Sequence, residues 1–543
     1  MAFSQLLEQL IHDTTDSSLS FFSTELWLSG TIVLMLLFRL FSIDRFLPAY
    51  VVALGGAVAA ALAAYSQSGH IAAQPTEFSQ QFFTGLLVQD LFSVYFRIFL
   101  SLFLILTIAL TVLTGIPDNE DGPDFYSLLF GATIGMMLMA SANNLLMLFL
   151  AVEMASVPSY VMVGFLKGRK PSSEAALKYV VYGAGAAGVM LYGISLVAGV
   201  LGTGDMSLLS DRLRVVAEGG VAGLADAEVR AVTLGVMLVM VGLAFKLSLV
   251  PFHFWCPDAF EGASAEVGGF LSVASKAGAF GLLVRFCVSL SGNPSTAHLM
   301  TAFGIGLGVI AIITTTFGNL AAYSQSNVKR LLAYSTIAHA GYMLMAVAAM
   351  LIMQNSEQAP ALGDDINKSI GALLYYLAVY LFMNLGAFAI VALIRNYTFS
   401  EEIDSYKGLV SQSPVLCICM MICMFSLVGM PPFGGFVGKL MIFASLYKAG
   451  ELHWSMYVVL AFGGLNTVFS LFYYLRVLKT MFLDERPADA RRVPLPAVEG
   501  SYVVLLALFV LLLGMAPWLP DGLSAIAGEA ANSVFPAVTA RGF

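Results

Sequence analysis

The stretch AVTLGVMLVMVGLAFKLSLVPFHFWC, residues 231–256, decides the fold of this 543-residue chain. Its apolar residues run on long enough to cross a bilayer as a helix, which takes about 20 residues. Lys246 is its only acidic or basic residue apart from a histidine, and Pro251 follows shortly after it. Proline removes a backbone N–H and opens the hydrogen bond to the preceding turn. The stretch therefore predicts a membrane-spanning helix that is broken beside a buried lysine.

The whole chain has the composition of an integral membrane protein. It is 59% hydrophobic and 11% charged, whereas a soluble domain carries about 25% charged residues. The apolar runs are continuous, which favours helices over an alternating barrel pattern. The sequence therefore predicts an all-α integral membrane protein with about 14 transmembrane helices. The candidate spans are 21–42, 49–65, 88–114, 124–141, 143–166, 178–201, 231–256, 262–290, 297–317, 327–353, 368–395, 409–447 (broken), 453–483 and 500–520.

The basic residues of the loops set the predicted orientation, because cytoplasmic loops carry an excess of Lys and Arg. With the N-terminus outside, fifteen of the 26 Lys and Arg residues fall in cytoplasmic segments and six in outer segments. We therefore expect a multi-pass protein of the prokaryotic inner (cytoplasmic) membrane, with both termini on the outer, periplasmic side.

A second segment, GMPPFGGFVGK at 429–439, resembles FKLSLVPFHFW at 245–255. Both place a Pro-Phe step inside an apolar span, at Pro251 and Pro432, and both place a lysine beside it. The second broken span is the fifth span after the first, and an odd offset reverses direction in the membrane. The pattern predicts two inverted five-helix repeats, each containing a broken helix.

This repeat divides the chain into four expected parts. Residues 1–123 hold three N-terminal helices, 124–290 the first repeat, 297–483 the second, inverted repeat, and 484–543 a C-terminal span and tail.

Two further lysines and a glutamate lie within apolar spans, where a lysine costs at least ~2.5–3.5 kcal/mol. Lys276 lies mid-span in LSVASKAGAFGLL, Lys439 follows the second break, and Glu153 lies in FLAVEMASVPSYV. Glu153 is the expected partner of Lys246, with a structural carboxylate at a span end as the alternative. Lysine can take and give protons, which arginine cannot. The set Glu153, Lys246, Lys276 and Lys439 therefore predicts proton movement across the membrane.

His253 and His339 also lie within spans. Imidazole titrates near neutral pH, so either histidine could relay protons between the lysines. A hydrogen-bonded core histidine is an equally good interpretation.

Several other charged residues lie where spans meet the cytoplasm in this arrangement. Lys329 and Arg330 are expected to anchor the protein at that surface, and Arg285 to extend its head group toward water from a span end. Three acidic residues are expected at the mouth of the lysine helices, where they feed protons inward or solvate the loop: Asp258, Glu261 and Glu266.

The sequence contains no pattern for a bound metal, cluster or cofactor. Three of the five cysteines, Cys417, Cys419 and Cys423, share one apolar helix and lack Cys-x-x-Cys loop spacing; they are expected to pack as small apolar residues. The chain shows neither a dinucleotide fingerprint nor a basic nucleic-acid-binding segment. We expect no metal site, no cofactor bound by this chain and no nucleic-acid partner.

Taken together, four features are similar to those of one known family. They are Lys246 before a proline break, Lys276 one helix later, Glu153 two helices earlier and Lys439 after PPFGGFVG. The chain resembles, over about residues 85–485, the antiporter-like proton-pumping subunits of respiratory complex I. A lysine at 439 is more similar to the subunit N (ND2) branch than to subunit M, and the end of the chain soon after the fourteenth span departs from subunit L.

The resemblance implies a function for each of these residues. Glu153 and Lys246 would form the pair that receives a charge change, Lys276 the central relay and Lys439 the exit-side group. It implies a subunit of a proton-translocating NADH–quinone oxidoreductase with no redox chemistry in this chain. The complex would use NADH, FMN, iron–sulfur clusters and quinone. Its other antiporter-like and small membrane subunits, and the lipid bilayer, would be the partners.

Three alternatives remain open on the sequence. One is a subunit of a multisubunit cation/proton antiporter, another is the membrane arm of a hydrogenase-type complex, and the last is a scaffold whose lysines are structural. The tail after residue 521 and the loop at 202–230 carry no motif that assigns them a function.

Overall fold

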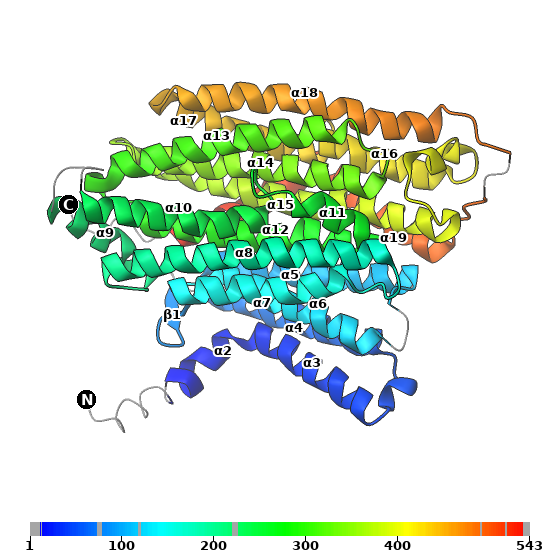
Figure 1. Cartoon of the computed structure of the whole chain (residues 1–543), viewed down its shortest axis with the longest axis horizontal. Helices are drawn as coiled ribbons and strands as arrows, with labels where there is room; N and C mark the ends of the chain where they lie inside the picture. The colour runs from blue at the N-terminus through cyan, green and yellow to red at the C-terminus, as the bar shows by residue number, and fades with distance from the viewer. Residues whose placement is uncertain are drawn as a thin grey trace.

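The computed structural model describes residues 11, 13–72, 79–117, 121–219, 226–488, 491–515 and 518–535. These residues are almost entirely helical, and the long helices lie side by side in one bundle (Figure 1). The blue N-terminal helices form one side of the bundle, and the orange helix α18 lies on the opposite side. The fold is the all-helical bundle that the composition predicts.

The number of spans agrees with the predicted fourteen. Thirteen described helices are long and apolar enough to cross a membrane. They are α3 (Ser23–Leu40), α4 (Ala49–Ala72), α5 (Leu91–Thr114), α6 (Gly122–Ser141), α7 (Leu145–Val163), α8 (Lys170–Leu201), α10 (Ala227–Leu247), α12 (Ala265–Leu290), α13 (Ala297–Ala322), α14 (Val328–Gln354), α15 (Gly363–Thr398), α18 (Ser455–Phe482) and α19 (Ala497–Met515). The remaining span is the broken pair α16 (Pro414–Val428) and α17 (Gly434–Leu452).

Short elements connect the spans, and one of them departs from the all-helical expectation. Strands β1 (Gln80–Phe82) and β2 (Leu87–Gln89) form a small antiparallel hairpin between α4 and α5. The short helices are α2 (Leu19–Phe21), α9 (Leu209–Gly219), α11 (Trp255–Gly262) and α20 (Trp518–Val534). Helix α9 lies in the 202–230 loop, for which the sequence assigned no function.

Several span boundaries differ from the prediction by five residues or more; α4, for example, ends at Ala72 rather than at 65. Helix α8 begins at Lys170 rather than at 178, because Pro171 stands in its first turn, where proline favours a helix start. The last predicted span, 500–520, corresponds to α19, which ends at Met515. Beyond α19, helix α20 packs against α15 and α5, and the Phe92 N–H donates to Ser533 Oγ at 2.9 Å.

Helices α12 and α14 form the centre of the bundle, since every residue in the most apolar stretch of each helix is buried. Helix α15 packs against both of them and is nearly as buried. By contrast, α3 and α4 bury only a minority of their residues and lie at the edge (Figure 1). Lys276 of α12 therefore lies in the most enclosed part of the molecule.

Both broken helices end in the same backbone motif. Helix α10 ends at Leu247, Ser248 takes a left-handed φ of 57°, and the Leu249 N–H donates to Ala244 O at 2.8 Å. Helix α16 ends at Val428, Gly429 takes a φ of 88°, and the Met430 N–H donates to Phe425 O at 3.0 Å. This six-residue closure is a Schellman motif, which stops a helix and leaves its last carbonyls free to accept other bonds. The two breaks predicted from Pro251 and Pro432 are thus well-defined helix ends.

Candidate functional site

Lys246 stands in the last turn of α10 and reaches α7. Its side chain is fully buried, and Nζ donates to Ser156 Oγ at 3.1 Å. Glu153 lies one turn earlier on α7 and is half-buried, and its charge interacts with that of Lys246. Both helices contribute to a small hollow lined by Glu153, Ser156, Tyr160, Gly183 and Phe245. The structure therefore brings Glu153 and Lys246 to one place, with Ser156 as the direct acceptor.

Lys276 crosses from α12 to the end of α10. Its ammonium donates to Leu247 O and to Ser248 Oγ, both at 2.9 Å. A helix C-terminus carries partial negative charge, which stabilises a cation there. Because Leu247 follows Lys246 directly, the charges of the two lysines interact. Lys276 thus binds the C-terminal end of α10 and lies next to the Glu153–Lys246 site.

Lys439 makes the same kind of contact at the second break. From the first turns of α17 its ammonium donates to Leu427 O at 3.1 Å and Val428 O at 2.8 Å, the last carbonyls of α16. The ammonium also lies 4.3 Å from the centre of the Tyr342 ring, a favourable cation–π distance. Both Lys276 and Lys439 are therefore buried cations whose direct hydrogen bonds go to neutral oxygens at a helix end.

His339 lies close to Lys439 in a hydrogen-bonded group of tyrosines. Its Nδ1 is 2.7 Å from Tyr376 Oη and its Nε2 is 3.3 Å from Tyr474 Oη, which also bonds Ser335. The charge of the Lys439 ammonium interacts with the His339 ring. This is the buried, hydrogen-bonded environment that a relay needs and that a structural histidine also has. Tyr376 and Tyr474 could not be predicted as partners of His339, since tyrosine is common in apolar helices.

His253 has different surroundings. Its ring packs 4.4 Å, centre to centre, from those of Phe254 and Phe317, and its buried Nδ1 has no partner among the described residues. The geometry brings His253 next to aromatic rings rather than to a lysine ammonium. Its role as a relay stays a prediction.

Two of the three acidic residues expected at the bundle end, Asp258 and Glu261, form ion pairs. Arg330 binds Asp258 at 2.7 Å and Glu261 at 2.5 Å, and Lys178 binds Asp258 at 2.9 Å. Partial burial acts to raise the pKa of Asp258, but the hydrogen bonds from Lys178 and Arg330 outweigh it and hold that pKa below its usual range.

Lys329 differs from the surface anchor that its position predicts. Its side chain is 2% exposed, and Nζ lies 2.8 Å from Glu401 Oε2. A loop that follows α15 covers it, because the Val328 N–H donates to Glu401 O. The anchor interpretation of Lys329 is therefore wrong, since its positive charge is neutralised inside the protein.

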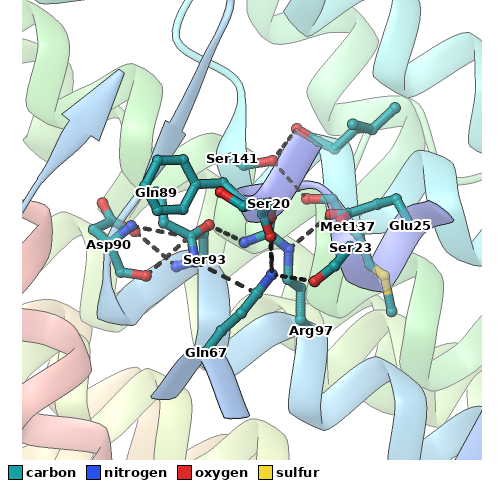
Figure 2. Close-up of polar contacts among 12 residues, drawn as sticks. Ser20, Ser23, Glu25, Gln67, Gln89, Asp90, Ser93, Arg97, Met137 and Ser141 are labelled. Atoms are coloured by element: carbon teal, nitrogen blue, oxygen red, sulfur yellow. Dashed lines mark hydrogen bonds and ion pairs between the residues drawn. The ribbon is translucent and has the colours of Figure 1, made fainter. Parts of the chain in front are cut away.

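A second buried polar group, which the sequence did not predict, joins the N-terminal helices to α5 (Figure 2). Arg97 Nε donates to Glu25 Oε1 at 2.7 Å, and both side chains are fully buried. Arg97 Nη1 donates to Gln89, and the Gln67 amide donates to Ser23 Oγ at 2.9 Å. These residues come from α3, α4, α5 and the β-hairpin, so the group fastens the first helices to the bundle.

Arg285 belongs to the same end of the bundle, and the expectation that it reaches toward water is wrong. Its Nη2 donates to Asp90 Oδ1 at 2.7 Å, and its Nε donates to Ala140 O. Its guanidinium also lies over the Phe92 ring. Asp90 caps α5 and is itself buried. The two partners of this buried ion pair are 195 residues apart in the sequence, so the pair could not be predicted from sequence.

The geometry described above is that of a proton-antiporter-like membrane subunit. A sequence model of the family described as "NADH:quinone oxidoreductase/Mrp antiporter, TM" matches residues 142–470, and the chain belongs to this family. Within the family it belongs with the subunits N of NADH-quinone oxidoreductase. That of Anaeromyxobacter sp. (strain Fw109-5) is 37% identical, over 90% of this chain and 92% of the relative. Subunit N 2 of Chloroherpeton thalassium is 38% identical over 86% of each chain.

Solved structures agree in fold. A chain of respiratory complex I from Thermus thermophilus with bound Aureothin is 29% identical, with a TM-score of 0.71 over 93% of this chain and 99% of that chain. A chain of the Mrp complex from Dietzia sp. DQ12-45-1b has a TM-score of 0.78 over 96% of this chain and 98% of that chain, at 19% identity. The second likeness concerns the fold alone.

Proposed function

We propose that this chain is a proton-translocating membrane subunit of a complex I-type NADH–quinone oxidoreductase, and that protons move through Glu153, Lys246, Lys276 and Lys439. One observation carries the lysine assignment: Lys246, Lys276 and Lys439 donate to hydroxyl and carbonyl oxygens and form no direct ion pair within the described part of the chain. A neutral oxygen accepts a hydrogen bond from an ammonium without fixing its charge as a carboxylate does. Such a lysine can lose and regain a proton.

The proposed mechanism follows from the order of the charges. When the Lys246 ammonium moves toward Glu153, it repels the protonated, positively charged form of Lys276 less, because like charges disfavour each other. When the Lys246 ammonium moves back, Lys276 tends to release its proton. The free carbonyls at the end of α16 and the ring of Tyr342 then hold a proton on Lys439. His339 is the relay candidate on this side.

Several wider statements belong to the same proposal. Quinone reduction would occur in other subunits, so NADH, FMN, iron–sulfur clusters and quinone would be bound elsewhere. The other membrane subunits of the complex would be partners, in a prokaryotic inner membrane with both termini of this chain outside. The four-part division at 123, 290 and 484, with inverted repeats at 124–290 and 297–483, is supported by the matching ends of α10 and α16.

Replacing Lys276 with alanine tests the function directly. We expect NADH-driven proton pumping by the assembled complex to fall by at least about tenfold, since one proton-transfer group typically contributes about 10²–10⁴-fold to a rate. Lys448→Ala is the matched control, since Lys448 is also a lysine but lies partly exposed beside Glu451. Normal pumping by an assembled Lys276→Ala complex would contradict the proposal and favour a structural scaffold.

A pull-down in mild detergent tests the partners. Flavin and iron–sulfur subunits with NADH-oxidising activity support the complex I assignment. Multispan proteins alone, without redox centres, would instead identify a cation/proton antiporter.

A further inference from the structure

Glu266, in the first turn of α12, is a buried carboxylate with no place in the mechanism above. Its side chain is 0% exposed, and neither carboxylate oxygen has a hydrogen-bond partner among the described protein groups. Buried polar groups are nearly always hydrogen-bonded, so each exception calls for an explanation. Two free oxygens on one buried acid leave it able to bind a proton, or water that carries one.

On one side Glu266 adjoins the charged end of the bundle. Its charge interacts with Lys329 of α14, whose ammonium also donates to Ala263 O at 2.5 Å, three residues before Glu266. Lys329 binds Glu401, which is 15% exposed and lies 3.7 Å from Arg395. Lys329, Glu401 and Arg395 thus form a series of charged groups between Glu266 and the protein surface.

On the other side α12 leads from Glu266 to Lys276. Ten residues separate them, about 15 Å along a helix. Ser272 lies between them, one turn before Lys276, and its Oγ accepts from Asn384 Nδ2 of α15 at 2.5 Å. Both side chains are fully buried, and Asn384 Oδ1 has no partner among the described groups. The seam between α12 and α15 thus carries a polar group with a free acceptor between the two ionisable residues.

The same seam is narrow near Glu266. A Cβ atom at Gly269 would lie 3.3 Å from the Phe388 side chain and 3.4 Å from Leu385. Helices α12 and α15 are therefore in close contact there, and apolar atoms surround the polar groups. A proton that moves along this seam needs water to enter it.

We propose that Glu266 is a further proton-carrying residue, which loads Lys276 from the bundle end at Lys329 and Glu401. The inference rests on the proposed function, since it requires Lys276 to exchange protons. A proton from water at that end binds the Glu266 carboxylate. The O–H bond of the acid then breaks, and its proton moves through water held by Asn384 and Ser272 to the neutral Lys276 amine. An N–H bond forms there and the carboxylate is restored.

A structural alternative is that Glu266 only balances the charge of Lys329. Three variants separate the two roles in the intact complex. Glu266→Gln keeps the shape but cannot carry a proton, and Glu266→Asp keeps the carboxyl group. Glu261→Gln is the control, because Glu261 is a nearby carboxylate that is 43% exposed and paired with Arg330.

The measurement is NADH-driven acidification of inverted membrane vesicles, scaled to the amount of complex by NADH oxidation with an artificial acceptor. We expect Glu266→Gln to slow acidification at least about fivefold, since a general acid–base group typically contributes about 10²–10⁴-fold to a rate. Glu266→Asp and Glu261→Gln should stay within about twofold of the native rate.

Each other outcome has one meaning when Lys276→Ala is measured alongside. If Glu266→Gln pumps normally while Lys276→Ala does not, this inference is wrong and the proposed function stands. If Gln and Asp at 266 are equally impaired, Glu266 serves packing or charge balance, and the inference is again wrong. If Lys276→Ala pumps normally, the proposed function itself fails.

Discussion

The two buried polar regions of this protein use different cations in different ways. In the N-terminal region Arg97 and Arg285 bind the carboxylates Glu25 and Asp90 directly, at 2.7 Å each. In the central region Lys276 and Lys439 bind carbonyl and hydroxyl oxygens. Arginine stays protonated in proteins, whereas a buried lysine changes its charge readily. The arginine pairs of the first region hold helices together, whereas the contacts of the second region fit the change of protonation state that we propose for it.

The largest expected effect is on the arginine region. Arg97→Ala leaves Glu25 as a buried carboxylate without a cation, which costs about 3–5 kcal/mol when one partner of a buried pair is removed. We expect less assembled complex and a lower unfolding temperature in detergent, measured by size-exclusion chromatography and a thermal shift. The double variant Arg97→Leu with Glu25→Leu should recover most of the loss, since no charge stays unpaired; no recovery would show that packing dominates.

The next largest effect comes from exchanging the cations. Lys276→Arg retains a positive charge but cannot release its proton, so pumping should fall at least tenfold, about 1.4 kcal/mol. The reverse exchange, Arg97→Lys, should leave pumping per assembled complex unchanged. Vesicle acidification scaled to complex content measures both; equal effects of the two exchanges would remove the distinction between the regions.

A smaller effect is expected at Ser248. Ser248→Gly removes the hydroxyl that accepts from Lys276 while glycine suits the left-handed φ of 57°. We expect the stability of the complex to be kept or raised and pumping to slow about threefold, because one hydrogen bond to a charged group is worth about 1.5–3 kcal/mol and Leu247 O partly replaces it. A thermal shift and the acidification rate distinguish the two effects. Unchanged pumping would show that the Leu247 carbonyl alone positions Lys276.

The smallest effect belongs to the surface. Lys448→Ala breaks an exposed pair with Glu451 that is worth about 0–1 kcal/mol. Neither the unfolding temperature nor pumping should change measurably, and salt should remove any difference that is seen. A clear loss of pumping would mean that the proton path reaches the surface near α17.

Lys246, Lys276 and Lys439 could be predicted from sequence because each lies inside a long apolar run. Their partners could not, since a serine hydroxyl or a helix-end carbonyl has no signature in an apolar segment. Ser248 is an example: nothing in the sequence before Pro251 distinguishes it, yet its hydroxyl accepts a hydrogen bond from Lys276. The helix count was predictable from hydropathy, whereas the true start of α8 depends on a polar first turn that hydropathy undervalues.

Arg285 and Lys329 were misread for a common physical reason. Each stands near the end of a span, where an isolated helix would extend the side chain into water or head groups. Here Asp90 and Glu401 arrive from distant segments and neutralise the charges inside the protein. Only the packing of the whole bundle determines whether a basic residue at a span end faces water.

Lys276 and Lys439, which each bind the end of a broken helix, differ in how helix motion affects their hydrogen bonds. Lys439 binds Val428, 11 residues earlier in the same broken helix, so its donor and acceptor move as one local unit. Lys276 binds Leu247 and Ser248 across the boundary between α12 and α10. A displacement between these two helices stretches the bonds of Lys276 and leaves those of Lys439 intact. Relative movement of two helices is therefore a means of altering the contacts of Lys276 that does not act on Lys439.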